Sequence, residues 1–216
     1  MLNDKIVTLS FDDNKINDMR FADTLDKYGI KCTFNVNSVS IGREGHIDKI
    51  FLRELANRHE IASHTVSHTQ FLPEKDIAEI RRQVVDDKKA IEDMIGRKIY
   101  GFAYPYGQYS DKMIGIVKEA GLVYARTIDN TYSFDFECEN FYTWHPTCHQ
   151  EKACGLIGKW KECGSGLFYI WGHSREFCDD WNKLDELLSR LKDVEGVKCL
   201  TNIEVYNMIN NKKSTD

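Results

Sequence analysis

Short apolar runs alternate with longer amphipathic segments along most of the 216-residue chain. The apolar runs are rich in β-branched and aromatic residues, which predicts strands at residues 6–11, 31–37, 59–63, 98–103, 122–127, 166–171 and 197–201. Between them, apolar residues recur at helical spacing, which predicts helices at residues 17–28, 46–58, 72–95, 111–120, 150–163, 181–193 and 202–211. Residues 128–149 follow neither period, so we expect an irregular segment there.

Two of the predicted helices have a clear apolar face. In the helix at 46–58 that face consists of Ile47, Ile50, Phe51 and Leu55. The long charged helix starts at Leu72-Pro73-Glu74, runs to about Ile95 and has an apolar stripe made of Ile77, Ile80, Val84 and Ile91. Core packing is the interpretation we adopt for both faces.

The order of the elements predicts the fold class. Strand and helix alternate about seven times, without an internal linker or a low-complexity segment. Such alternation is typical of parallel strands joined by crossover helices, and hence of an α/β barrel or a doubly wound sheet. A chain of 216 residues is long enough to form one such domain, which we expect to span residues 1–216.

Composition and charge narrow the range of functions. The net charge of −5 is spread along the chain without a basic stripe, so nucleic acid is not expected as a partner. The seven cysteines are irregularly spaced, which favours free thiols in a reducing compartment over a disulfide framework. No apolar run is long enough to span a membrane, and no export signal precedes the first strand. As written, the sequence predicts a cytoplasmic protein, unless an export signal has been removed from it.

Chemically active side chains follow the predicted strands. They are Asp12 and Asp13, His64 and His68, Tyr106, Arg126, and His173. In α/β folds the carboxyl ends of the strands form the face that carries the active site. This convergence indicates a functional site more strongly than any one motif does.

His64 and His68 lie four residues apart in the polar segment Ser63-His64-Thr65-Val66-Ser67-His68. This spacing is expected to place both imidazoles on one side of a helical turn, where they can share a metal ion. A pair of this kind also arises by chance, so a metal site requires a third ligand from elsewhere in the chain.

Four segments together resemble the ordered motifs of the polysaccharide deacetylase family, the NodB-homology group of carbohydrate esterases. They are Thr8-Leu9-Ser10-Phe11-Asp12-Asp13, His64-Thr65-Val66-Ser67-His68, Phe102-Ala103-Tyr104-Pro105-Tyr106-Gly107 and Tyr169-Ile170-Trp171-Gly172-His173. The resemblance extends from residue 6 to about residue 205. It implies a distorted (β/α)7-type barrel and one divalent metal ion, most commonly Zn²⁺, with Co²⁺, Ni²⁺ or Mn²⁺ as alternatives.

The resemblance also implies a role for each matching residue. Asp13, His64 and His68 would be the metal ligands, a donor set that suits Zn²⁺. Asp12 would be the catalytic base, although it could instead orient a metal-ligating histidine. His173 would be the general acid, and the alternative is that it has a purely structural role. The backbone N–H of Tyr106 would stabilise the oxyanion, whether or not its ring only packs.

The chain departs from the family pattern at three places. Asn14 replaces a glycine after the aspartate pair, and asparagine tolerates positive φ better than most residues. Ala103 stands where the family often has an arginine that pairs with the base, and we expect Arg126 to replace that arginine unless it has a surface role. The family's Asp-x-x-Asp-Trp segment has no clear counterpart here, because Asp129 lacks the following tryptophan.

The segment Trp144-His145-Pro146-Thr147-Cys148-His149 carries further chemical groups. His145, Cys148 and His149 could form a second metal site, but their spacing matches no standard zinc motif and a pocket wall is the preferred interpretation. We expect Tyr104, Pro105, Trp144 and Trp171 to contact the substrate. For Tyr104 and Trp171 the alternative is core packing.

Taken together, the residues and the resemblance predict a hydrolase acting on carbon–nitrogen bonds other than peptide bonds. Its substrate would be an N-acetylated sugar or polysaccharide, and acetate would be released. Two alternatives remain open: a deacylase of another small N-acyl or O-acyl compound, and a non-catalytic carbohydrate-binding protein. The sequence does not specify the oligomeric state.

Overall fold

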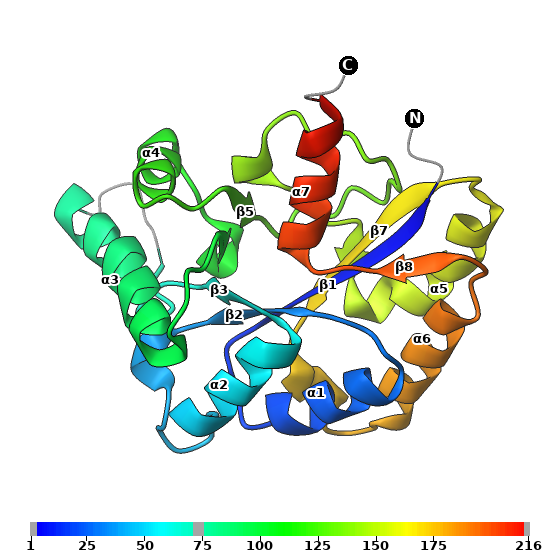
Figure 1. Ribbon diagram of the computed structural model, residues 1–216, viewed down its shortest axis with the longest axis horizontal. Helices are drawn as coiled ribbons and strands as arrows, with labels where there is room; N and C mark the ends of the chain where they lie inside the picture. Colours follow the sequence, from blue (N-terminus) through cyan, green and yellow to red (C-terminus); the bar gives the residue numbers. More distant parts are fainter. Residues whose placement is uncertain (1–3, 71–75, 214–216) are drawn as a thin grey trace.

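A curved parallel sheet forms the centre of the computed structural model, which describes residues 4–70 and 76–213 (Figure 1). The strand order is β5-β4-β3-β2-β1-β7-β6, and β8 pairs with the first half of β1. The strands are β1 (Lys5–Asp12), β2 (Thr33–Val36), β3 (Glu60–Ser63), β4 (Gly101–Ala103), β5 (Tyr124–Arg126), β6 (Cys148–His149), β7 (Gly166–Gly172) and β8 (Val197–Cys199). The sheet curls into a distorted barrel, which confirms the predicted fold class.

Helices surround the sheet, as the alternating pattern predicts. They are α1 (Asp18–Lys27), α2 (Lys49–Arg58), α3 (Ile77–Ile95), α4 (Asp111–Glu119), α5 (Gln150–Glu162), α6 (Asn182–Lys192) and α7 (Asn202–Lys213). Four short 3₁₀ helices are η1 (Ser38–Ser40), η2 (Pro105–Gly107), η3 (Phe141–Thr143) and η4 (Ser174–Phe177). The start predicted for the long helix, Leu72-Pro73-Glu74, lies within residues 71–75, outside the described residues.

Local signals explain where several helices begin and end. The side chains of Asp48, Asp76 and Ser110 accept hydrogen bonds from backbone N–H groups in the first turns of α2, α3 and α4. Gly96 ends α3 with a φ of 75°, a left-handed conformation that glycine adopts without steric cost.

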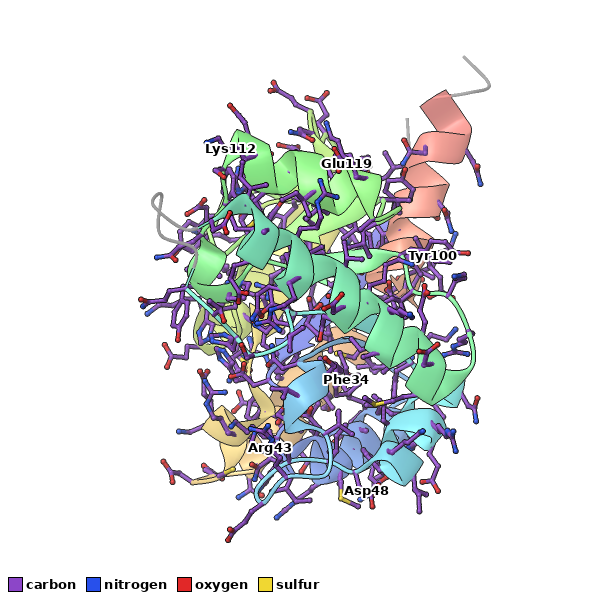
Figure 2. All side chains as sticks on the ribbon, turned by 90° about the vertical axis from the view of Figure 1, so that its left-hand side faces the viewer. Phe34, Arg43, Asp48, Tyr100, Lys112 and Glu119 are labelled. Carbon is purple, nitrogen blue, oxygen red and sulfur yellow. The ribbon has the colours of Figure 1, made fainter. Side chains whose placement is uncertain are left out.

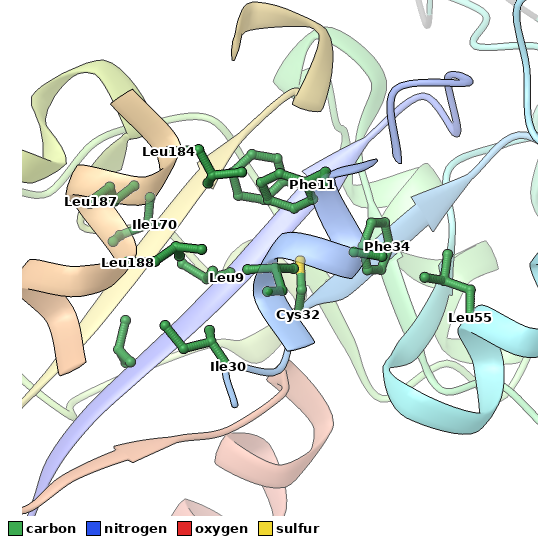
Figure 3. Packing of buried hydrophobic residues seen from close by; sticks show 14 of the residues in the cluster. Leu9, Phe11, Ile30, Cys32, Phe34, Leu55, Ile170, Leu184, Leu187 and Leu188 are labelled. Atoms are coloured by element: carbon green, nitrogen blue, oxygen red, sulfur yellow. The ribbon is translucent and has the colours of Figure 1, made fainter. Parts of the chain in front are cut away.

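Strand β1 separates two environments through its alternating side chains. Val7, Leu9 and Phe11 pack into the hydrophobic cluster between the sheet and helices α1, α2 and α6 (Figure 3). The intervening residues Thr8 and Ser10 are fully buried on the opposite face, inside the barrel. Asp12 belongs to this second set, so it lies at the carboxyl end of a polar barrel interior.

Hydrogen bonds satisfy most of the polar groups inside the barrel. Thr8 donates to the Asn202 side-chain oxygen at 2.8 Å, and Asn202 donates to the Tyr169 hydroxyl at 2.6 Å. Asn35 donates to both Ser10 and Asp12 at 2.8 Å. Because buried polar groups are costly unless paired, this network restricts how the strands can be arranged around the interior.

The segment predicted to be irregular contains the strand that completes the barrel. The Trp144 N–H bonds to the Ala125 carbonyl at 2.9 Å, and the Thr127 N–H bonds to the Trp144 carbonyl at 3.1 Å. Four residues later, β6 pairs in parallel with β7. The prediction was wrong at this point because β6 is only two residues long, follows Pro146 closely and has no alternating pattern of its own.

Two apolar residues assigned to the core are instead exposed. Ile50 is 69% exposed and Ile77 is 47% exposed. Helix α2 begins at Lys49, so Ile47 precedes it and helical spacing does not carry from Ile47 to Ile50. Ile77 lies in the first turn of α3, before the stripe of Ile80, Val84 and Ile91 reaches the core.

All seven cysteines are free thiols. None of the helices in the described ranges combines the length and the apolar character needed to cross a membrane.

Glu60 provides a test of the polar interior. Its carboxylate accepts hydrogen bonds from Thr33, Tyr124 and the Ile203 N–H, and burial raises its pKa from 4.5 to about 7. The folded protein therefore binds this proton more tightly than the unfolded chain. Its contribution to stability is complete below pH 4.5 and is lost as the pH rises through about 7.

As the pH rises from 4.5 to 8, we expect the free energy of unfolding of the wild type to fall by up to about 3 kcal/mol relative to that of Glu60→Gln, which has no proton to lose at this position. Urea unfolding across this pH range measures the difference. The exposed Glu195 supplies the matched control, since Glu195→Gln should follow the wild type at every pH. A constant difference between Glu60→Gln and the wild type would contradict this account.

Candidate metal centre

The carboxyl ends of four strands bring the predicted site residues together. Asp12 ends β1, Arg126 ends β5, and His64 and His173 directly follow β3 and β7. Asp13 directly follows β1, and its Oδ2 atom accepts a hydrogen bond from the guanidinium of Arg175 in η4. The predicted convergence at one end of the barrel is therefore present in the structure.

Asp13, His64 and His68 form a set of donors with the spacing of a metal site. The Asp13 Oδ1 atom lies 3.8 Å from His64 Nε2 and 3.5 Å from His68 Nε2. Donors that each lie about 2.1 Å from one ion at tetrahedral angles are about 3.4 Å apart. The three side chains thus fit a zinc-like ion and leave a coordination position open on it.

The local backbone around the histidine pair differs from the expected helical turn. Residues 64–68 are not helical, and Thr65 and His68 have φ values of 70° and 51°. The two rings nevertheless approach to 4.8 Å between centroids. A turn with left-handed residues, and not the i, i+4 helical spacing, therefore brings the two imidazoles together.

Backbone strain is concentrated at this centre. Among the described residues, six other than glycine have positive φ, and five of them flank the site: Asp13, Asn14, Thr65, His68 and Tyr106. Such conformations are costly and persist where the surrounding structure determines them, most often at functional sites. The expectation that Asn14 tolerates positive φ is confirmed by its φ of 40°.

His64 is oriented by a backbone carbonyl. Its Nδ1 atom lies 2.8 Å from the Ala103 oxygen, which can only accept, so Nδ1 carries the proton and Nε2 presents its lone pair to Asp13 and the metal position. Asp12 is farther away, at 4.0 Å from His64 Nε2. The alternative role for Asp12, that of orienting this histidine, is therefore performed by Ala103.

Asp12 forms the buried ion pair expected with Arg126. The guanidinium Nη2 lies 2.6 Å from each carboxylate oxygen, and the two side chains are 0% and 4% exposed. Burial alone would raise the pKa of Asp12, but Arg126, His64 and His173 together lower it to about 2. Asp12 is thus ionised at neutral pH. The contact replaces the arginine that is missing at Ala103.

His173 approaches the centre from the end of β7, which lies on the other side of β1 from β2 and β3. Its Nε2 atom is 3.9 Å from Asp13 Oδ2, and its Nδ1 atom is 2.8 Å from Glu176 Oε1. Burial alone would lower the pKa of His173, but the Glu176 hydrogen bond and the Asp12 and Asp13 carboxylates raise it above its ordinary value. The imidazole is therefore disposed to hold a proton, as a general acid must.

Glu176 is a candidate functional residue that the sequence interpretation missed. Its Oε2 atom accepts from Gln150 at 2.7 Å and lies 3.1 Å from His149 Nε2. Burial raises its pKa, but hydrogen bonds from His149 and His173 lower it to about 2. The only signal in the sequence was an acidic residue three positions after His173, a spacing that η4 turns into contact.

The second metal site considered at His145, Cys148 and His149 is not formed. His145 bonds to Thr127 at 2.6 Å, and Cys148 is fully buried with a pKa raised by burial to about 12. His149 instead joins His173 and Glu176, a group whose donor atoms also lie within metal-binding distance of one another. Trp144 and His145 line a pocket of about 410 Å³, as the alternative interpretation expected, but none of the metal-site residues borders it.

Three of the four residues expected to contact substrate are buried. Tyr104 is 1% exposed, Pro105 is also buried, and Trp144 is 4% exposed. Tyr104 and Pro105 are core residues, so the prediction that these two contact a sugar is corrected, whereas Trp144 borders the pocket of about 410 Å³, which no metal-site residue reaches. Trp171 is half-buried and packs against the Arg126 guanidinium at 5.1 Å, and its role in binding stays a prediction. The exposed aromatic ring beside the centre is Tyr106, whose centroid lies 4.6 Å from that of His68.

Comparison with known proteins places the chain among relatives of one family. A family model described as polysaccharide deacetylase matches residues 2–125. YxkH of Bacillus subtilis (strain 168), provisionally named as a polysaccharide deacetylase, is 28% identical over 123 residues. This match covers 55% of the chain and 43% of the relative, so the chain spans less than half the length of YxkH.

Two solved structures extend the comparison to most of the chain. A family 4 acetyl xylan esterase from Clostridium thermocellum, in complex with a cobalt ion, has a TM-score of 0.68 at 20% identity and covers 95% of this chain and 92% of its own. A CE4 family pseudoenzyme from Bacillus anthracis has a TM-score of 0.65 at 18% identity, covering 94% of this chain and 66% of its own. At these identities the likeness shows the fold alone.

Removing one partner of the buried ion pair should destabilise the protein strongly. We expect Arg126→Met to lower the free energy of unfolding by about 3–5 kcal/mol, because Asp12 would remain buried without its counter-charge. Adding Asp12→Asn should recover part of that loss, a coupling that urea unfolding of the two single variants and the double variant measures.

The exposed pair of Arg81 with Glu119 is the matched control for this experiment. Arg81→Met should cost less than about 1 kcal/mol, since surface ion pairs contribute little. Equal losses for Arg81→Met and Arg126→Met, or strict additivity with Asp12→Asn, would contradict the account of the buried pair.

Proposed function

The chain belongs to the polysaccharide deacetylase family, and on this premise we propose that it is a metal-dependent hydrolase that removes N-acetyl groups from an N-acetylated sugar or polysaccharide. The proposed substrate carries peptidoglycan- or chitin-like N-acetylglucosamine, and acetate is released. The observation that carries the proposal is the arrangement of an ionised carboxylate, Asp12, and a proton-holding imidazole, His173, beside one three-donor metal site.

Asp13, His64 and His68 would hold the divalent ion, with Zn²⁺ as the first choice and Co²⁺, Ni²⁺ or Mn²⁺ as alternatives. Bound there, the ion supplies a Lewis acid beside the acetyl carbonyl and makes a neighbouring water a better nucleophile. Arg175 and the left-handed turn at Asp13 hold the carboxylate in position toward both histidines.

Asp12 acts as the base in this proposal. It accepts a proton as water adds to the acetyl carbonyl carbon, and the Arg126 guanidinium holds it ionised and fixed before that step. A carboxylate with a pKa of about 2 is a weak base by itself, so the water must already be activated by the ion at the neighbouring site. The backbone N–H of Tyr106 is the proposed second stabiliser of the developing oxyanion.

His173 donates its proton to the nitrogen as the carbon–nitrogen bond breaks, so the sugar leaves as a neutral amine. A nitrogen leaving group departs far more readily as a neutral amine than as an amide anion, so it needs a proton from an acid. The alkoxide leaving group of an ester depends less on protonation. The hydrogen bond to Glu176, which favours the charged imidazole, therefore supports an amide substrate over an ester.

Acetate release is the direct test of this function. We expect the zinc-loaded protein to release acetate from N-acetylglucosamine oligomers, a chelator to abolish the release, and added Zn²⁺ to restore it. Asp12→Asn should lower kcat by at least about 100-fold.

Measurement of acetate together with metal content distinguishes the candidate functions. Release only from acetyl esters would favour the broader deacylase. Bound metal without release from any acyl compound would favour a non-catalytic protein.

Glu176→Gln tests the acid. The amide keeps the size of the side chain and an oxygen that can accept from His173, but it removes the negative charge that stabilises protonated His173 and turns one acceptor into a donor toward Gln150. We therefore expect kcat to fall about 10- to 100-fold while KM changes little. The exposed Glu151, whose Oε2 atom lies 3.8 Å from Nδ1 of His149, gives the control Glu151→Gln, which is expected to match the wild type. A Glu176→Gln enzyme with unchanged kcat would remove Glu176 from the mechanism.

A further inference from the structure

A pocket of about 320 Å³ adjoins the metal centre, and two of the three candidate ligands, Asp13 and His68, form part of its wall. The rest of the wall comes from the chain that follows β1 and β2 and from the histidine turn: Lys15, Asn37, Val39, Ser40, Arg43, His46 and Ser67. Apart from Asp13 and His68, none of the residues assigned to removal of the acetyl group lines this pocket, so the rest of its lining indicates what else the ligand carries.

The charges of the wall are one-sided. Lys15 and Arg43 are cationic, and Asp13 is the only acidic residue among those that line the pocket. The Asp13 carboxylate is already shared between Arg175 and the candidate metal position. The surplus is therefore positive, although the chain as a whole has a net charge of −5.

Lys15 has hydrogen-bond donors to spare in this arrangement. Its Nζ atom lies 2.9 Å from His46 Nε2, and His46 Nδ1 lies 3.0 Å from the Glu44 carbonyl oxygen. Because that oxygen only accepts, Nδ1 carries the imidazole proton and Nε2 accepts from the ammonium group. Two N–H groups of Lys15 remain for a ligand, and the histidine serves to hold the lysine.

Arg43 supplies the second charge from the loop between η1 and α2, on the face of the molecule seen in Figure 2. Its side chain is exposed, and within residues 4–70 and 76–213 it forms no hydrogen bond or ion pair. An arginine fork with no partner among the described residues, on the wall of a pocket beside the site, is suited to bidentate contact with a carboxylate or a phosphate.

The cationic wall is tied to the metal centre by short contacts through Asn14. The Asn14 side chain donates to Ser40 at 2.8 Å and accepts from the Asn37 N–H at 2.9 Å, and its carbonyl accepts from the Ile47 N–H at 3.1 Å. Lys15 and His46 also form an antiparallel bridge. The chain segments that carry the two charges are therefore held relative to Asp13, which favours a ligand that spans both places.

We propose that this pocket binds an anionic substituent, a carboxylate or a phosphate, on the sugar whose acetyl group lies at the metal centre. The preferred substrate is then an acidic N-acetylated amino sugar and not a neutral one. The inference rests on the proposed deacetylase function and specifies its substrate class.

Three probes with the same N-acetylated ring test the inference: N-acetylglucosamine, N-acetylmuramic acid with its lactyl carboxylate, and N-acetylglucosamine 6-phosphate. Binding is measured by NMR titration in the presence of chelator, where no turnover occurs, and kcat/KM by acetate release with Zn²⁺. At least one anionic probe should bind about tenfold more tightly than the neutral sugar, with the advantage shrinking as salt is added. The stronger anionic probe identifies carboxylate or phosphate as the source.

Arg43→Gln should reduce the anionic-to-neutral ratio of affinities about tenfold, and Lys15→Gln should reduce it similarly. Lys49→Gln, which removes one exposed positive charge from α2 outside the pocket, should leave the ratio unchanged. Equal binding of neutral and anionic probes by the wild type, or a ratio that Arg43→Gln leaves intact, would overturn the inference.

The binding and turnover arms fail separately. Acetate release from all three probes at equal kcat/KM, with equal affinities, would overturn the acidic-sugar inference and leave the proposed deacetylase in place. An anionic preference in binding with no acetate released from any probe would support the pocket assignment and remove the proposed function.

Discussion

The buried ion pair between Arg126 and Asp12 is the contact on which the barrel interior and the metal centre both depend. Arg126 ends β5 and Asp12 ends β1, so the pair links strands that lie four positions apart in the sheet. Both charges are removed from water, a cost that their mutual contact and the hydrogen bonds of Asn35 and Thr127 offset. The polar side chains of the barrel interior thus provide the partners that a charged residue at the carboxyl ends of the strands requires.

The alternation of strand β1 assigns different roles to two adjacent carboxylates. Asp12 continues the inward-facing series of Thr8 and Ser10, and meets Arg126 inside the barrel. Asp13 leaves the strand with a φ of 82° and turns toward His64 and His68. Arg126 therefore holds one carboxylate inside the barrel, and Arg175 holds the other beside the two histidines. A single step along the chain separates the proposed base from the candidate metal ligand.

Much of the architecture follows from local patterns, but the contacts between distant segments do not. Alternation of strands and helices indicated parallel strands in a barrel or a doubly wound sheet, and the family resemblance favoured the barrel. The positions of Asp12, Asp13, His64 and His173 after strands indicated one site. The Arg126 contact was expected because Ala103 stands where the family often has an arginine that pairs with the base, and Arg126 ends the next strand along the chain. Glu176 was missed because its contact with His173 depends on the short η4 turn, and Tyr104 was misassigned because an aromatic after a strand can point either way. The closing strand β6 was missed because two residues carry no period.

The central claim is that Asp13, His64 and His68 bind one divalent ion between the Asp12 carboxylate and the His173 imidazole. Anomalous diffraction at the zinc edge from crystals grown with Zn²⁺ tests this most directly. The account predicts one peak about 2.1 Å from an Asp13 oxygen and from the Nε2 atoms of His64 and His68. A peak instead among His149, His173 and Glu176, or no peak near Asp13, would contradict it, because His173 would then be a ligand or the site would bind no metal.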